Sequence, residues 1–246
     1  MADWNYEPAR DHGLPPLERM RSHRREAGLF SAAARLLWWT AWAAILRVWN
    51  RLRVEGRKHL PAGDSYILVA NHESHLDVFC LTAALPLGAR RRFVPLSAED
   101  VFFEKPTRTF FAAHILNALP VRRGKGVRHG FAAMRERLLA EPTIYAIFPA
   151  GKRARDTAML PFRAGIGMLV AGTDIPVVPC HVEGAFEALR PETKVLWPHR
   201  LVVRIGAPRT FRDEPDDREG WERIAARLED DVRSLGREPP RPPAAD

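Results

Sequence analysis

The stretch that decides the fold is YILVANHESHLDVFCLTAAL, Tyr66 to Leu85. Its first part, Tyr66–Ala70, is a continuous apolar run, which is typical of a strand buried on both faces of a parallel sheet. Its last part, Asp77–Leu85, favours a helix. Two histidines, an asparagine, a glutamate and a serine lie in the loop between them. Ligands of open α/β sheets bind where loops leave the carboxyl ends of the strands, so this loop is a candidate site.

The same alternation of strand and helix continues along the chain. Further strands are predicted over Arg92–Ser97, Leu119–Val121, Thr143–Phe148, Ile175–Val182 and Arg200–Gly206. Further helices are predicted over Phe110–Leu116, Val127–Ala140, Gly165–Thr173 and Trp221–Leu235. This pattern predicts an α/β fold, a single domain with a mostly parallel central sheet flanked by helices. Pro176 and Pro179 suggest that their strand lies at an edge or carries a bulge.

The length of 246 residues suits one hydrophobic core. Residues 1–27 are polar and rich in charge and proline, and we expect an irregular segment without the apolar stretch of a secretory signal. We expect a first, membrane-associating helix over 28–53 and the main domain over 54–235. Residues 236–246 are proline-rich and predict an extended tail.

The helix expected over 28–53 is rich in tryptophan. Its uninterrupted apolar run, Leu36 to Leu46, is about half of the roughly 20 residues that a membrane span needs. Tryptophan favours the membrane interface, and Arg35 and Arg47 at the ends of the run suit lipid headgroups. We therefore predict a membrane-interface helix, peripheral or monotopic. Two alternatives stay open: a core helix of the domain, and a true span that starts near Leu29 if Arg35 snorkels.

The formal net charge is +8, and most of the positive charge is arginine. Arginine suits phosphate, carboxylate and anionic lipid, so charge alone does not choose between nucleic acid, a membrane surface and phosphorylated small molecules. The basic residues lack the interleaved aromatic side chains of single-strand binders, and we predict no nucleic-acid partner. Cys80 and Cys180 each lie in an apolar run, which predicts buried thiols in a reducing compartment.

His72 and Asp77 are the candidate catalytic residues. If Ser74 caps the helix, Asp77 stands at the third helical position, a capping-box spacing that explains both residues structurally. That role does not explain His72, whose ring can approach Asp77 across the strand-to-helix turn. A carboxylate on one imidazole nitrogen fixes the tautomer and leaves the other nitrogen free to accept a proton from an alcohol. We therefore predict His72 as general base and Asp77 as its orienting partner.

Two rival chemistries have weaker support in this loop. The order His-Glu-Ser-His brings the second histidine one residue too early to share a helical face with the first, unlike the zinc-protease motif. No other His, Cys or Asp cluster offers the remaining ligands, so no metal is predicted. A Ser74 nucleophile would lack the Gly-x-Ser-x-Gly elbow of the hydrolases.

NHESHLD resembles the His-x4-Asp motif of the glycerolipid acyltransferases, the family of 1-acylglycerol-3-phosphate acyltransferases. Three further blocks follow in the order of that family: NALPVRRG (Asn117 to Gly124), FPAGKRAR (Phe148 to Arg155) and IPVVP (Ile175 to Pro179). The resemblance covers roughly Val54 to Gly206. Two positions depart from the family pattern. Asn117 stands where glycine is frequent, and Ala150 stands where the family has a glutamate that helps to hold the acceptor.

The resemblance implies an acyltransferase domain over 54–235. It would transfer a fatty acyl group from a thioester, acyl-CoA or acyl carrier protein, to a hydroxyl of a lysophospholipid or related lipid, without a further cofactor. Arg123, Lys152 and Arg153 would bind phosphate, and Gly151 would permit a tight turn beside the ligand. Membrane lipids and the acyl donor would be the partners, at the cytoplasmic face of the cell membrane.

Several properties stay open at this stage. Ala150 leaves the acceptor undecided, and nothing in the sequence fixes the acyl chain length, the donor carrier or the oligomeric state. The alternative function is a membrane-bound lipid-binding protein on a catalytically altered acyltransferase fold, and Ala150 is the residue that supports it.

Overall fold

The computed structural model describes residues 11–26, 28–63, 65–121, 127–154, 158–190 and 195–236, without the side chains of Val127 and His129. The tail expected over 236–246 lies outside the described residues apart from Gly236, which ends the last helix.

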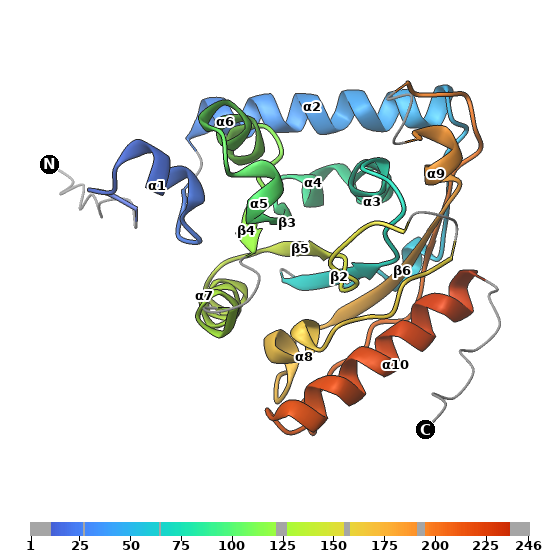
Figure 1. The fold of residues 1–246 in the computed structure, drawn as a ribbon. Coiled ribbons are helices and arrows are strands. Elements are labelled where there is room, and N and C mark those ends of the chain that lie inside the picture. The colour runs from blue at the N-terminus through green and yellow to red at the C-terminus, as the bar shows by residue number, and fades with distance from the viewer. Residues whose placement is uncertain are drawn as a thin grey trace, which may run out of the picture.

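A seven-stranded sheet runs through the molecule in the order β1-β7-β6-β2-β5-β3-β4 (Figure 1). The strands are β1 Arg53–Glu55, β2 Tyr66–Ala70, β3 Phe93–Ala98, β4 Leu119–Val121, β5 Ile144–Ile147, β6 Val177–Glu183 and β7 Val202–Ile205. All neighbouring pairs are parallel except β6 and β7. The predicted α/β fold with a mostly parallel sheet is therefore confirmed.

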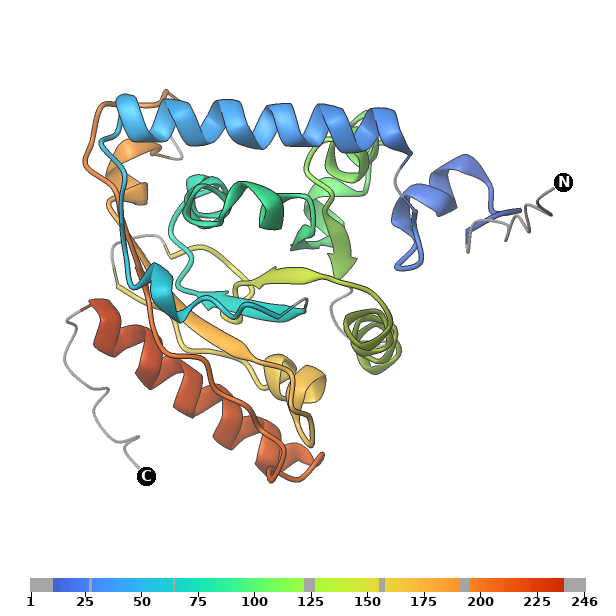
Figure 2. The same ribbon diagram turned by 180° about the vertical axis from the view of Figure 1, so that it is seen from behind.

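Helices cover both faces of the sheet (Figures 1 and 2). One face carries α2 Leu29–Val48, α3 Leu76–Ala84, α4 Leu87–Arg90 and α6 Pro106–His114, and the other carries α7 Val127–Ala140, α8 Gly165–Val170 and α10 Arg218–Gly236. The short helices are α1 Pro16–Arg21, η1 Arg57–His59, α5 Glu99–Phe102 and α9 Ala185–Ala188. Successive residues of β2 point alternately into the two cores, as the continuous apolar run predicts.

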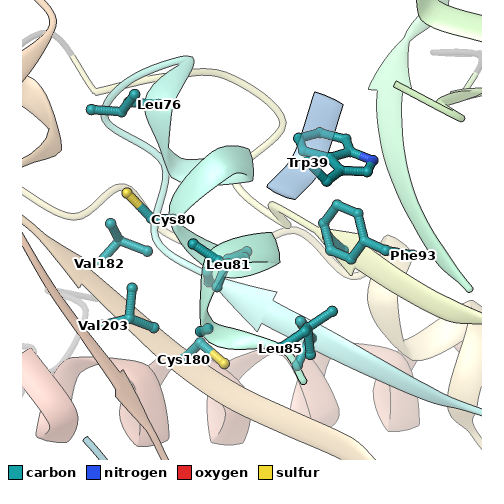
Figure 3. Packing of buried hydrophobic residues seen from close by; sticks show 14 of the residues in the cluster. Trp39, Leu76, Cys80, Leu81, Leu85, Phe93, Cys180, Val182 and Val203 are labelled. Carbon is teal, nitrogen blue, oxygen red and sulfur yellow. The ribbon is translucent and has the colours of Figure 1, made fainter. Parts of the chain in front are cut away.

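The core beneath α2 includes the inner face of that helix (Figure 3). Trp39 is 1% exposed and meets Phe93 edge to face, with 5.6 Å between the ring centroids. Leu46 is fully buried in the same cluster. Cys80 and Cys180 are free and buried here, and burial raises the pKa of both thiols. The helix is thus part of the domain on its inner side, which the sequence analysis had kept only as an alternative.

The outer face of α2 is apolar and exposed. Leu29 is 92% exposed, Phe30 88% and Leu37 72%. By length and composition the helix could cross a membrane, and only 22% of its most apolar stretch of 18 residues is buried inside the domain. The helix ends at Val48 rather than at 53, because Arg51 takes a left-handed conformation with φ 48° and the Leu52 N–H returns to the Leu46 carbonyl. One apolar face of the helix is buried and the other is exposed, which explains why its sequence pattern fitted both a core helix and an interfacial helix.

The N-terminal segment is more ordered than its composition suggested. Within the stretch expected to be irregular, Pro16–Arg21 form α1, with proline at the first helical position. Arg25 is buried and donates to the Ala118 carbonyl at 3.1 Å and to Asn117 Oδ1 at 3.3 Å. These tertiary contacts, rather than local propensity, hold the segment against the sheet edge at β4.

Strand β6 is an interior strand, so the expectation of an edge was wrong. It lies between β2 and β7, with Pro179 opposite Val69. On the β7 side, Val177 pairs with Arg209 and Cys180 pairs with Ile205. The segment that follows β7 has one more residue between these two pairs than β6 has, so the pairing contains a bulge. Pro179 lies within this bulge, where the ladder is irregular, and Pro176 precedes the first residue of β6.

Candidate active site

The loop between β2 and α3 brings His72 and Asp77 together. His72 Nδ1 lies 2.8 Å from Asp77 Oδ2, and the Asp77 side chain is fully buried. The same oxygen accepts the backbone N–H groups of Glu73 at 2.8 Å and Ser74 at 3.0 Å. A carboxylate only accepts hydrogen bonds, so His72 holds its proton on Nδ1 and leaves Nε2 free as a proton acceptor.

The capping expected for this turn is present only in part. Ser74 Oγ accepts the Leu76 N–H at 3.3 Å, and the Asp77 carboxylate reaches back to the Ser74 N–H. The helix begins at Leu76 with His75 as its N-cap, so Ser74 lies one residue before the cap, and Asp77 is the second helical residue instead of the expected third. Ser74 Oγ also donates to the Leu189 carbonyl at 3.0 Å, which ties the turn to the end of α9. One local motif thus forms the helix start and orients the histidine.

Asn71 fixes the start of the loop, a role that the sequence analysis did not assign. It is 1% exposed, and its amide pairs with Val182 of β6 in both directions at 2.8 Å. Its Nδ2 also donates to Glu73 Oε1 at 3.0 Å. Because β2 and β6 are neighbours, this clamp sets the direction in which His72 leaves the sheet.

The third sequence block meets the first one. It follows β5, the other neighbour of β2. The Phe148 ring stacks on the His72 ring with 4.1 Å between centroids, and the Ala154 N–H donates to the His72 carbonyl at 2.8 Å. Gly151 has φ +71° and its N–H returns to the Phe148 carbonyl at 3.0 Å, so the tight turn expected there is present.

A cavity of about 1140 Å³ opens beside His72. Gly151, Lys152 and Arg153 line it together with His72. Most of its remaining wall is apolar and comes from β3, β4, α3, α5, α6, α7, α8 and the segment between α6 and β4. The apolar lining residues there include Val78, Phe79, Leu96, Val101, Phe102, Phe111, Leu116, Val121, Phe131, Ile166 and Met168. In the part of the chain that the structure describes, no acidic residue lines it. An apolar cavity with a cationic side suits a ligand with a hydrocarbon chain and an anionic group.

Two further lining residues escaped the sequence analysis. Loss of water around the His75 ring, followed by the positive charges of Arg153 and His72, lowers the pKa of His75 to about 4. His75 is therefore neutral near pH 7. Arg163 adds a third cation, and a Cβ built on Gly151 would lie 3.7 Å from its Nε. Arg163 has no motif around it, because only the path of the chain between the third block and α8 brings it back to the turn.

The second block contributes an edge of the site. Asn117 adopts φ +59°, and its Nδ2 donates to the Phe93 carbonyl at 3.1 Å. A left-handed residue explains why glycine is frequent here in the family pattern and why asparagine can replace it. Arg123, the candidate phosphate ligand of this block, lies outside the described residues.

Ala150 is 5% exposed and is not among the residues that line the cavity. In the described part of the chain, residue 150 therefore has no contact with the cavity through which it would influence the choice of acceptor. Among the described residues, no group of three or more His, Cys, Asp or Glu side chains is arranged to hold a metal ion.

Comparison with known proteins adds the family. The family model described as Acyltransferase matches residues 51–183. The chain belongs to the Acyltransferase family. It is 26% identical over 171 residues to 1-acyl-sn-glycerol-3-phosphate acyltransferase alpha of Mus musculus, covering 68% of this chain and 58% of that protein. It is 26% identical over 203 residues to 1-acyl-sn-glycerol-3-phosphate acyltransferase of Saccharomyces cerevisiae, covering 76% and 62%.

The chain spans about three fifths of the length of those curated relatives. Its fold is similar to the crystal structure of the 1-acyl-sn-glycerophosphate acyltransferase PlsC from Thermotoga maritima. The TM-score is 0.62, with 19% sequence identity over 82% of this chain and 78% of the other. The likeness supports the fold, and the matched family region, 51–183, contains all four sequence blocks.

Proposed function

We propose that this acyltransferase moves a fatty acyl group from an acyl thioester to the free hydroxyl of a 1-acylglycerol-3-phosphate or a related lysophospholipid, with His72 as general base. The observation that carries the proposal is the His72–Asp77 pair at the side of a large apolar cavity. The curated relatives bear names of 1-acyl-sn-glycerol-3-phosphate acyltransferases, which favours this acceptor class.

In this mechanism the acceptor hydroxyl gives its proton to His72 Nε2 as its oxygen attacks the thioester carbonyl carbon. The resulting imidazolium is stabilised by Asp77, whose oxygen lies 2.8 Å from Nδ1. When the tetrahedral intermediate collapses, the C–S bond breaks and the proton passes from His72 to the departing thiolate. No covalent enzyme intermediate is required, in line with direct transfer between two bound substrates.

The cationic residues hold the phosphate groups of the substrates. Lys152, Arg153 and Arg163 all line the cavity. Both proposed donors, acyl-CoA and acyl carrier protein, present their thiol on a phosphopantetheine arm, and the acceptor carries a phosphate monoester. Since no described lining residue is acidic, the charged side chains of the cavity wall present a positive potential to each of these anionic groups.

The exposed face of α2 would place the cavity beside a membrane. The large apolar side chains that α2 leaves exposed over its first half are Leu29, Phe30 and Leu37, and an apolar helix face of this kind favours the bilayer interface. We propose a peripheral or monotopic position on the cytoplasmic face of the cell membrane, where acyl-CoA and acyl carrier protein are found.

The purified chain in detergent micelles, given labelled acyl-CoA or acyl carrier protein with a panel of lysophospholipids, tests the function. We expect a diacyl product and release of one free thiol per turnover. Binding of lysolipid without any transfer from either donor would instead support the lipid-binding alternative. The intact His72–Asp77 contact argues against that alternative.

A further inference from the structure

The end of α3 remote from His72 carries a concentration of positive charge. Three arginines from three different elements donate to three consecutive carbonyls there. Arg47 of α2 reaches Ala83 O at 2.7 Å, Arg57 of η1 reaches Ala84 O at 3.0 Å, and Arg90 of α4 reaches Leu85 O at 3.3 Å. Figure 2 shows α2 running above α3 and α4.

Capping of the helix accounts for only part of this arrangement. A helix C-terminus carries about half a negative charge, which one cation is enough to complement. None of the three arginines forms an ion pair with an acidic side chain in the described parts of the chain. Burial, followed by the charges of Arg47 and Arg57, lowers the pKa of Arg90, so the guanidinium groups repel one another.

The surrounding sequence adds charge of the same sign. Residues 47–58 and 87–92 contain many basic residues, and their single acidic residue is Glu55. Glu55 Oε2 is already 3.3 Å from Arg204 Nε, on the far side of β1. Among the described residues no acidic side chain therefore pairs with these arginines at the end of α3, and planar guanidinium groups are well suited to phosphate.

Exposed apolar side chains border the same end of α2. Val48 is 82% exposed, Trp49 52% and Leu87 55%. Trp49 Nε1 donates to the Leu196 carbonyl at 3.2 Å, and the next residue along that loop, Trp197, is 55% exposed. Two exposed tryptophans on one junction, next to arginines, match the composition of proteins at the bilayer interface.

We propose that Arg47 and Arg57, which are exposed, form a binding site for the phosphate groups of anionic phospholipids in a bilayer, separate from the substrate cavity, and that the buried Arg90 adds positive charge behind them. Val48, Trp49, Leu87 and Trp197 enter the interface beside it. This site holds the C-terminal end of α2 at the membrane. The exposed apolar residues Leu29, Phe30 and Leu37 hold its N-terminal half there. The inference rests on the proposed membrane association, and it adds a lipid charge preference that α2 alone does not require.

The test is co-sedimentation of the full chain with vesicles of phosphatidylcholine alone and of phosphatidylcholine with about one third phosphatidylglycerol. The double variant Arg47→Gln/Arg57→Gln removes two charges, and the glutamine Nε2 at position 57 takes the place of the Nε that donates to the Ala84 carbonyl. An arginine near an anionic bilayer contributes roughly fivefold in binding, so the variant should bind the anionic vesicles about 30-fold more weakly. Its binding to the neutral vesicles should be unchanged.

The matched control is Arg218→Gln/Arg223→Gln, which removes two exposed charges from α10 on the opposite face of the sheet (Figure 1). Its binding to the anionic vesicles should weaken by less than about threefold. An equal loss in both double variants would show a general charge effect and overturn the site. Vesicle binding that glycerol phosphate in solution abolishes would point to a soluble phosphate ligand instead, and loss of a dimer in the first variant would point to an interface between copies.

Two readouts separate this site from the proposed function. If the wild-type chain binds neither vesicle, membrane association itself fails. If it binds both equally and the variant matches it, only the phosphate site fails. Acyl transfer to a soluble short-chain acceptor should be the same in wild type and variant, because the three arginines lie at the end of α3 away from His72.

Discussion

Substitution of Asp77 by asparagine tests the link between the fold and the chemistry. In the structure three donors converge on Asp77 Oδ2: His72 Nδ1 and the backbone N–H groups of Glu73 and Ser74, at 2.8 to 3.0 Å. The other oxygen, Oδ1, is buried without a hydrogen-bond partner among the described residues. Asparagine can keep its oxygen toward the donors, but it removes the negative charge that stabilises the imidazolium.

The size of the effect follows from those contacts. Loss of the charge that orients and stabilises the histidine costs up to about 10⁴-fold in kcat in the serine-protease triad, and general base catalysis as a whole is worth roughly 10²- to 10⁴-fold. We expect kcat to fall by about 10³-fold in Asp77→Asn, with KM for the acyl donor nearly unchanged. Hydrogen bonds to a charged group contribute about 1.5–3 kcal/mol, so the free energy of unfolding should fall as well.

The assay is thiol release from acyl-CoA under saturating lysolipid, with circular dichroism to show that the variant is folded. Ser74→Ala is the matched control, because it removes the bonds of Ser74 Oγ to Leu76 and Leu189 and leaves the Asp77 oxygens in place. It should lower stability and keep kcat within about tenfold. A folded Asp77→Asn protein with normal kcat, or one whose whole loss lies in KM, would refute the assigned role of Asp77.

Three other predictions concern the rest of the molecule. Burial, followed by the positive charge of Arg204, lowers the pKa of His181 to about 4. The unfolded chain binds the same proton near pH 6.5, so the free energy of unfolding falls by about 3 kcal/mol as the pH falls from 6.5 toward 4, and it is unaffected by this group at higher pH. His181→Phe should flatten that part of the stability–pH curve in chemical denaturation, and an unaltered curve would contradict the assignment. Trp39→Ala should cost about 3–5 kcal/mol in the same assay, because Trp39 is 1% exposed in the core; unchanged stability would mean that α2 serves only the membrane. Ala150→Glu buries a carboxylate at a position that is 5% exposed, so it should lower the melting temperature and leave the preference among lysolipids unchanged; a raised rate on one acceptor would show that residue 150 meets substrate.

Much of the fold could be predicted because its signals are local. The apolar run of β2 and the Ser74–Asp77 spacing specify a strand, a turn and a helix start within a dozen residues, and the structure has all three. The interior place of β6 could not be predicted, since it depends on pairing with β2 and β7, which are distant in sequence. Its prolines gave a correct hint of a bulge and a wrong hint of an edge.

The candidate site shows the same division. His72 and Asp77 lie five residues apart across one strand-to-helix turn, so their contact could be predicted from spacing alone. The Phe148 ring on His72 and the position of Arg163 beside Gly151 depend on β5 and α8 meeting that loop in space. For α2, an apolar pattern does not say which neighbours a face will have, so the core position of Trp39 and the exposure of Leu37 became clear only from the packing.

The most direct test of the central claim is acyl transfer by His72→Ala beside His75→Ala. Both histidines line the cavity, but only His72 is held by a carboxylate. With acyl-CoA and 1-acylglycerol-3-phosphate as substrates, His72→Ala should lose at least about 10³-fold in kcat. His75→Ala should stay within about tenfold of the wild-type protein. Near-normal turnover by a folded His72→Ala protein, or equal losses in the two variants, would contradict the assignment of His72 as the general base.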